Sequence, residues 1–164
     1  PTTARQIETA ENLGFKGVEV DFNALATGDG LKQEIERVLQ RASSAFETGL
    51  SPILYTAKGE TVQPAARSLN LDRVGKTLGR LLATLKGRHH LDRVAVAGGD
   101  TSSHALEELD VFALTLRQAI PTTPGSPVCT AHTRGGSEFE IALKGGQIGN
   151  DTYFADLRDG TFES

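Results

Sequence analysis

Two glycine-rich turns contain the residues best suited to bind a phosphate. Residues 98–103 read Gly-Gly-Asp-Thr-Ser-Ser, and residues 144–149 read Lys-Gly-Gly-Gln-Ile-Gly. Glycine has no Cβ, so another group can come close to the backbone at these turns. A helix that begins at the small hydroxyl residues of the first turn would present amide N–H groups without partners inside the helix, and its dipole favours an anion there.

Each turn also has a simpler interpretation. The first fits an ordinary strand-to-helix turn with a Thr or Ser cap, and the second fits a loose connection with an exposed lysine. Neither turn matches G-x-x-x-x-G-K-[ST], and G-x-G-x-x-G is absent because residues 145–149 read Gly-Gly-Gln-Ile-Gly. Anion binding therefore stays a hypothesis at this stage.

Two charged residues in the turns could assist such binding. Asp100 could hold Mg²⁺ through water, because hard cations prefer oxygen ligands, or it could only cap the helix. Lys144 could reach a phosphate as a point charge, or its side chain could lie in solvent. Thr56 and Lys58 end another predicted strand, so we expect them near the same crevice.

No metal centre is predicted from the histidines, because none has a third ligand in view. We expect solvated positions for all four, which are His89, His90, His104 and His132.

Strands and helices must position the two turns. Val94 and Val96 predict a buried strand over 93–99, and a second strand over 139–144 leads into the other turn. Ligands of open α/β sheets lie beyond the carboxyl ends of the strands. If these strands are neighbours, both turns flank one crevice.

The rest of the chain alternates between segments with the two-residue apolar period of strands and segments with the 3.6-residue period of helices. The predicted helices cover 1–13, 31–48, a segment from Leu71 that ends before Gly87, 102–109, and a segment from about Asp151. The other predicted strands cover 16–25, 51–58, 111–120 and 128–132, with a polar loop at 59–68. This order predicts a three-layer αβα sandwich with a mixed, mostly parallel central sheet and an antiparallel part near the C-terminal end.

Composition limits the function classes. A chain of 164 residues suits one domain that buries about 70% of its unfolded surface. The net charge of −4 argues against a nucleic-acid partner. Cys129 is the single cysteine, which excludes an intrachain disulfide, favours a core position and predicts a reducing compartment, the cytoplasm. No apolar run suits a membrane span and no signal peptide is visible. The start at Pro1 and the lack of Met suggest a piece of a longer protein.

Three motifs in order carry a family resemblance. The sequence reads GGDT at 98–101, PGSPV at 124–128 and ALKGGQIG at 142–149. This order resembles the nucleotide-binding C-terminal domain of the four-carbon acid sugar kinases. The opening PTTARQIETA at 1–10 is also similar to the start of that domain.

The resemblance implies ATP-dependent phosphorylation of threonate, erythronate or an oxo-tetronate. It matches the nucleotide-binding turn to Gly98, Gly99, Asp100 and Thr101, and the second turn to Gly146. We add the flanking residues Lys144, Gly145 and Gly149 as nucleotide-binding candidates, and Asp100 as the Mg²⁺ candidate. No catalytic residue is predicted.

The resemblance also implies missing parts. The family's ATP-contacting serine would fall before Pro1, and its N-terminal domain, with paired aspartates and the sugar-acid site, is not in this sequence. We therefore expect this chain alone to be inactive. The alternative is a nucleotide- or anion-binding regulatory module without transfer chemistry.

Overall fold

The computed structural model describes residues 2–58 and 70–162. The described helices are α1 (Thr2–Asn12), α2 (Phe22–Thr27), α3 (Leu31–Glu47), α4 (Leu71–His89), α5 (Gly99–Glu108) and α6 (Tyr153–Asp159). The strands are β1 (Phe15–Glu19), β2 (Ser51–Tyr55), β3 (Arg93–Ala97), β4 (Val111–Gln118), β5 (Val128–Thr133) and β6 (Glu138–Lys144). The predicted loop over 59–68 lies outside the described residues.

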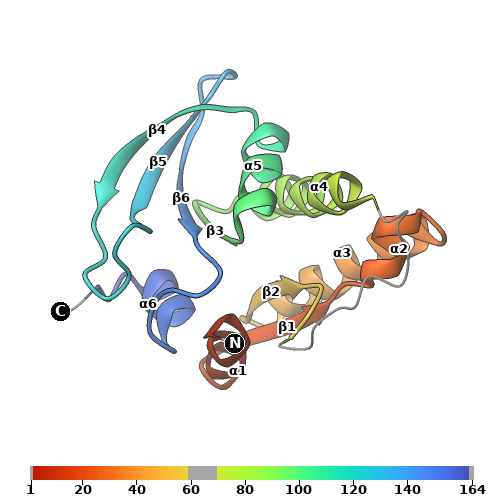
Figure 1. Cartoon of the computed structure of the whole chain (residues 1–164), viewed down its shortest axis with the longest axis horizontal. Helices are drawn as coiled ribbons and strands as arrows, with labels where there is room; N and C mark the ends of the chain where they lie inside the picture. The colour runs from red at the N-terminus through yellow and green to blue at the C-terminus, as the bar shows by residue number, and fades with distance from the viewer. Residues whose placement is uncertain (1, 59–69, 163–164) are drawn as a thin grey trace.

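The described strands form two hydrogen-bonded sheets (Figure 1). β1 and β2 pair in parallel, and the second sheet has the order β3-β6-β5-β4. In it β3 and β6 are parallel, whereas β5 is antiparallel to both β6 and β4. The predicted α/β sandwich with mixed pairing and an antiparallel C-terminal part is confirmed, with the strands divided between two sheets.

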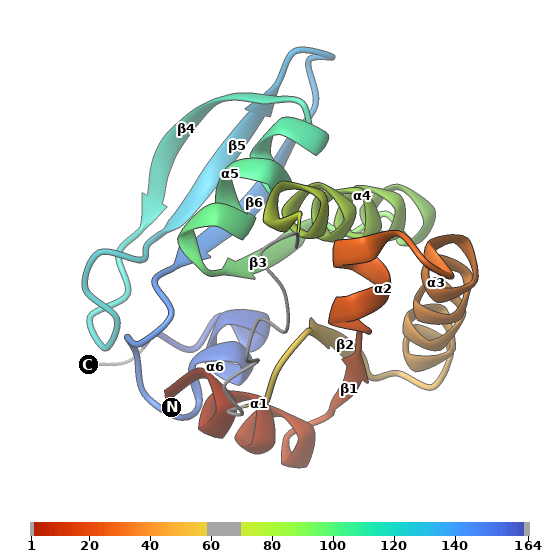
Figure 2. The ribbon, with the colours of Figure 1, turned by 45° about the vertical axis from the view of Figure 1, so that its right-hand side comes forward.

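Helices cover both faces of the four-stranded sheet. Ile141 and Ala142 follow each other in β6, so their side chains point to opposite faces, and both are fully buried. Ile141 lies in an apolar cluster with side chains of α4 and α5, whereas Ala142 lies in a cluster with Tyr153 and Leu157 of α6. α1 contacts α6, which gives two outer helical layers, α1 with α6 and α3 with α4 and α5 (Figure 2).

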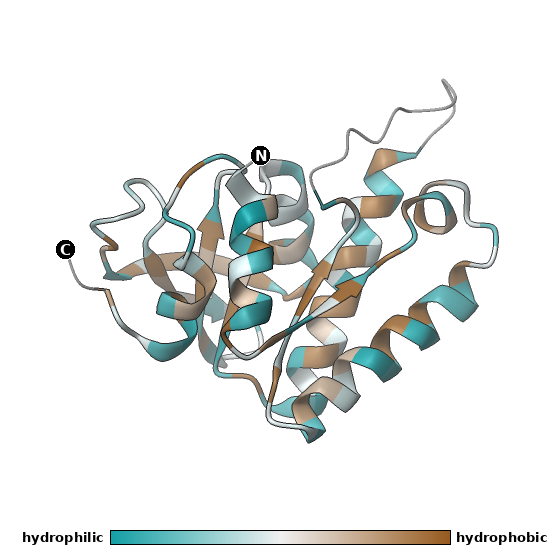
Figure 3. Cartoon of the chain, turned by 90° about the horizontal axis from the view of Figure 1, so that it is seen from below, coloured by the Kyte–Doolittle hydropathy of each residue, from teal (hydrophilic) through white to brown (hydrophobic). Residues whose placement is uncertain are grey.

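The two-stranded sheet packs against the amphipathic helices that the sequence predicts most clearly. Val18 and Val20 lie in the same apolar cluster as the inner faces of α3 and α4. Figure 3 shows hydrophobic and hydrophilic residues alternating along these helices. The buried residues that α3 and α4 contribute to the cluster are Val38, Leu39, Ala42, Val74, Leu81 and Leu85. Within the described residues, no helix combines the length and the apolar character that crossing a membrane needs.

The predicted strand over 16–25 is wrong in its second half. β1 ends at Glu19, and the chain then forms α2. Asp21 caps this helix, because its Oδ1 accepts from the backbone N–H of Asn23 at 2.8 Å and of Ala24 at 3.2 Å. Gly28 ends it with a φ of 89°. A side-chain cap thus overrides the alternation of apolar residues.

Two predicted helix boundaries also differ. α4 continues past Gly87 to His89, and His90 forms its cap with a φ of 50°. α5 begins at Gly99 rather than at Ser102, so Asp100 and Thr101 lie inside its first turn. This second difference places the first glycine turn directly on a helix N-terminus.

Candidate functional site

The two glycine-rich turns lie side by side at the carboxyl ends of β3 and β6. β3 and β6 are parallel neighbours, with Ala97 opposite Lys144. The N–H of Gly98 donates to the carbonyl oxygen of Lys144 at 2.9 Å, so the ladder continues into the turns. The expectation that both turns flank one edge is confirmed.

The first turn leaves the start of α5 without a side-chain cap. Gly98 is the N-cap residue, with φ 108° and ψ 133°, and no side chain caps the helix there. The hydroxyl of Ser102 instead donates to the carbonyl of Gly98 at 2.7 Å, and that of Ser103 to the carbonyl of Gly99 at 3.4 Å. The Thr or Ser cap of the simpler interpretation is therefore wrong. The first amides of α5 are available to a ligand.

The glycines of the two turns differ in the space around them. A Cβ built on Gly99 or on Gly146 would meet nothing within 4 Å, so the backbone is open at both positions. A Cβ on Gly145 would make only an ordinary contact at 3.6 Å. Gly149 has a φ of 89°, and a Cβ there would lie 2.9 Å from Thr123 Oγ1. Gly149 is thus required by packing, whereas Gly99 and Gly146 leave room for another group.

Lys144 is buried rather than exposed, which corrects the interpretation of the second turn as a loose connection with a solvated lysine. Only 2% of Lys144 is exposed, and burial lowers the pKa of its ammonium. Its Nζ donates to the carbonyl of Gly145 at 2.7 Å and to that of Gly146 at 3.3 Å. Lys144 therefore stabilises the second turn from its buried side. In this arrangement its N–H donors point at protein oxygens.

The beginning of α1 completes the site, which the residue-by-residue reasoning on the turns missed. The N–H of Thr2 donates to Gln147 Oε1 at 3.0 Å, and the hydroxyl of Thr3 donates to the carbonyl of Gly146. Gln6 is fully buried, and its amide donates to the carbonyl of Ile148 at 3.0 Å. The signal in the sequence was the similarity of residues 1–10 to the start of the family domain, because a glutamine alone predicts a surface position.

The remaining candidates differ in their surroundings. Asp100 is exposed, and no group of three metal-ligating side chains occurs among the described residues. Thr56 and Thr101 line the same cavity. Lys58 forms an ion pair with Glu11, so its charge is already balanced.

The expectation of solvated histidines holds for His90, which is exposed, whereas the other three are half-buried and contact neighbouring side chains. His89 Nε2 lies 2.9 Å from Ser43 Oγ, and His132 Nδ1 lies 2.9 Å from Glu138 Oε1. His104 lies 3.6 Å from Asp72. His104 Nδ1 also lies 3.8 Å from Glu107, and no group of three or more side chains that could hold a metal ion occurs in residues 2–58 and 70–162.

Comparison with known protein families assigns the chain to one of them. The sequence profile of a family described as the nucleotide-binding C-terminal domain matches residues 1–154. The chain belongs to this family. The resemblance to the C-terminal domain of the four-carbon acid sugar kinases is thereby confirmed.

Curated relatives of this family member are kinases by name. The chain is 36% identical to a 3-oxo-isoapionate kinase of Paraburkholderia graminis, over 98% of this chain and 37% of that protein. It is 31% identical to a 3-oxo-tetronate kinase of Pseudomonas fluorescens, over 83% of this chain and 30% of that protein. A 3-oxo-tetronate kinase of Cupriavidus necator is 29% identical. The chain thus spans about a third of the length of these relatives.

Solved structures share the fold. A domain of unknown function from Bordetella bronchiseptica, crystallised with bound citrate as a domain-swapped dimer, superposes with a TM-score of 0.73. It is 22% identical, over 94% of this chain and 36% of that one. A putative tRNA synthase from Salmonella typhimurium superposes with a TM-score of 0.71 at 21% identity, over 99% of this chain and 38% of that one. At these identities the likeness concerns the fold alone.

Proposed function

We propose that this chain is the ATP-binding domain of a kinase that phosphorylates a small sugar acid. The observation that carries the proposal is the meeting of the two turns, where the N–H of Gly98 bonds to Lys144 beside the uncapped start of α5. Phosphoryl transfer depends on positioning and charge stabilisation, and a helix N-terminus with open glycine backbone suits a phosphate. The kinase names of the curated relatives support the same function.

Each residue of the site has a distinct proposed role. The first amides of α5, at Gly99, Asp100 and Thr101, face the phosphates of ATP. Gly146 lets the nucleotide come close to the second turn, because a Cβ there meets nothing within 4 Å. Lys144 fixes that turn through its bonds to the carbonyls beneath it. Mg²⁺ would be held by the phosphates and water, with Asp100 as one acceptor.

The binding role can be tested by adding a branched Cβ at the open glycines. Gly99→Val and Gly146→Val should each weaken ATP binding in calorimetric titration by about tenfold or more, which is ~1.4 kcal/mol. Gly87→Val is the matched control, because a Cβ at Gly87 also meets nothing within 4 Å and it lies in α4, away from the turns. Unchanged affinity in folded Gly99→Val and Gly146→Val would remove the turns as the site.

The substrate of the proposed kinase is a small acid with a four-carbon backbone. The three curated relatives carry the names of 3-oxo-acid kinases, which favours a 3-oxo acid over threonate or erythronate. The full-length protein should be assayed with Mg²⁺-ATP against 3-oxo-tetronate, 3-oxo-isoapionate, threonate and erythronate. ATP binding without phosphorylation of any acid in this panel would instead favour the regulatory module.

A further inference from the structure

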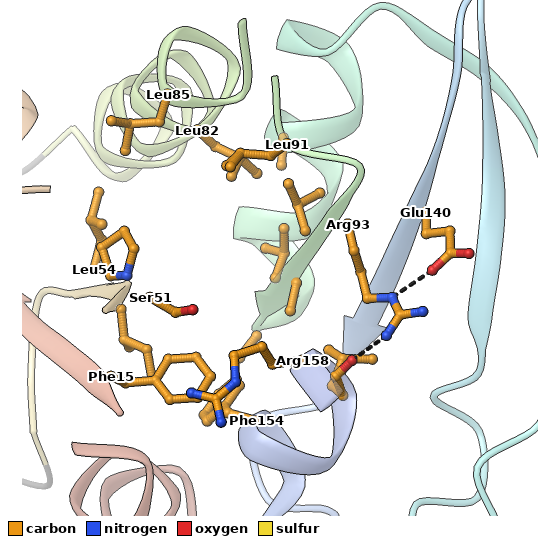
Figure 4. A pocket seen from close by; sticks show the side chains of 18 of the residues that line it. Phe15, Ser51, Leu54, Leu82, Leu85, Leu91, Arg93, Glu140, Phe154 and Arg158 are labelled. Carbon is orange, nitrogen blue, oxygen red and sulfur yellow. Dashed lines mark hydrogen bonds and ion pairs between the residues drawn. The ribbon is translucent and has the colours of Figure 1, made fainter. Parts of the chain in front are cut away.

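A cavity of about 950 Å³ separates the two sheets. β2 lines one wall and β3 lines the other, each along its whole length. Most of the lining side chains are apolar, with Leu82, Leu85 and Leu91 on one side and Phe15 and Phe154 on the other (Figure 4). Arg158 also lines the space, with its guanidinium over the Phe15 ring. The cavity therefore has the shape of a slot between two strand edges.

The backbone of β2 directs hydrogen-bonding groups into this slot. Ser51 donates its N–H to the carbonyl of Gly14 at 3.1 Å, and the carbonyl of Tyr55 accepts from Val20 at 2.8 Å. Alternate residues of a parallel strand bond to the same neighbour, so the odd-numbered residues of β2 bond to β1. The N–H and C=O of Leu54 consequently point away from β1, on the side of the cavity.

The same parity argument applies to β3. The carbonyl of Asp92 accepts from Glu140 at 2.7 Å, and Gly98 donates to Lys144 at 2.9 Å. The even-numbered residues therefore bond to β6, and Ala95 and Ala97 present their backbone groups to the cavity. Two rows of backbone donors and acceptors face the slot from its opposite walls.

The position of α1 shows where a strand between these rows would lead. α1 begins beside Gln147, just past the carboxyl end of β6, and it ends at the start of β1. A strand that runs parallel to β3 and ends at this edge would enter α1 directly. Strand, α1 and β1 would then form a βαβ unit, whose crossover connects parallel strands.

We propose that a β-strand from the chain that precedes Pro1 in the full-length protein fills this cavity and joins the two sheets into one. The curated relatives have chain to supply it, since this sequence covers only 37% of the 3-oxo-isoapionate kinase. The strand bonds to Leu54 on one side and to Ala95 and Ala97 on the other. Helices cover both faces of the slot, so the strand is apolar on both faces and rich in Val and Ile.

Amide hydrogen exchange of the full-length protein tests this proposal without any nucleotide. The amides of Leu54, Ala95 and Ala97 should exchange as slowly as those of Val94 and Val96, which bond to β6 and serve as internal controls. In residues 1–164 alone, the first three amides should exchange about tenfold faster or more relative to the same controls. Fast exchange of the three amides in the full-length protein would overturn the proposal.

A second copy of the chain is the competing source of a strand, as the domain-swapped Bordetella relative illustrates. Light scattering alongside the exchange measurement separates the two. Protection of Leu54, Ala95 and Ala97 that is unchanged when the full-length protein is diluted to a monomer supports a strand from the same chain. Protection that disappears with the dimer, or that arises in residues 1–164 only on dimerisation, contradicts it.

Discussion

Gly98 and Gly99 are adjacent but serve different purposes. Gly98 has a φ of 108°, which side chains rarely adopt, whereas Gly99 has no positive φ and open space around it. We expect Gly98→Ala to lower the free energy of unfolding by about 1–3 kcal/mol, because the alanine would be strained there. Urea denaturation measures this loss. Gly99→Ala is the control and should stay within about 0.5 kcal/mol of the unmodified protein; equal losses would contradict the distinction.

Lys144 predicts a pH dependence of stability. Burial lowers the pKa of its ammonium below the ordinary value of 10.5, so in the window between the two values the unfolded state binds the proton more strongly. This residue therefore makes stability rise as pH increases through that window. Lys144→Met should remove this rise, as measured by urea denaturation from neutral pH to about pH 10.5.

The comparison of the two proteins is essential in this experiment. The hydrogen bond from Lys58 to Glu11 raises the pKa of Lys58, which contributes the opposite trend at higher pH. That contribution is common to both proteins and cancels in their difference. A difference that stays constant with pH would show that Lys144 has an ordinary pKa in the folded state.

At the scale of secondary-structure elements, a side-chain cap can set where a helix begins when the apolar periodicity does not show it. Asp21→Ala should destabilise the protein by about 1 kcal/mol, because the amides of Asn23 and Ala24 lose their acceptor at the start of α2. Thermal unfolding measures the change. Asp21→Asn is the matched control, since asparagine caps a helix about as well. Its N–H would still donate to Glu34, as Asp21 does at 2.7 Å. If Asp21→Asn lost as much stability as Asp21→Ala, the cause would be the charge of Asp21 and not its capping hydrogen bonds.

Sequence patterns predicted the elements whose apolar spacing is regular over many residues. The helix expected over 31–48 is α3 at Leu31–Glu47, and the antiparallel partners near the C-terminal end are β4, β5 and β6. The prediction failed at α2, because Val18, Val20 and Phe22 continue the alternation of a strand past the cap residue Asp21. Both glycine turns were identified, and the pairing of β3 with β6 brings them together.

Other properties of the site depend on contacts that local sequence does not contain. The buried Lys144 contacts Thr3, whose Oγ1 lies 3.4 Å from its Nζ although the two residues are 141 positions apart. The fully buried state of Gln6 depends likewise on the carbonyls of Ile148 and Asn150. Charge and polarity normally indicate solvent, so sequence reasoning assigns such side chains to the surface unless a family resemblance intervenes.

At the scale of the whole molecule, we predict that residues 1–164 bind ATP but phosphorylate no sugar acid. Transfer needs the attacking hydroxyl held in line with the γ-phosphate, and we assign the acid-binding part to the remaining two-thirds of a full-length protein of the relatives' size. Adding the separately expressed N-terminal part should restore turnover in a coupled ADP assay. Gly99→Val, which should impair ATP binding, controls for contaminating kinases. Turnover by residues 1–164 alone that Gly99→Val abolishes would contradict this division of labour.

The placement of β6 between β3 and β5 has a consequence for synthesis on the ribosome. β3 pairs with β6, and Arg93 stands opposite Glu140, 47 positions later in the chain. At about 5–20 residues per second, roughly 2 to 9 seconds separate the synthesis of these partners. Until β6 emerges, the β3 edge that β6 will cover stays bare, and an unpaired edge of this kind can associate with other chains. The two glycine turns therefore become neighbours only when the penultimate segment of the domain has left the exit tunnel.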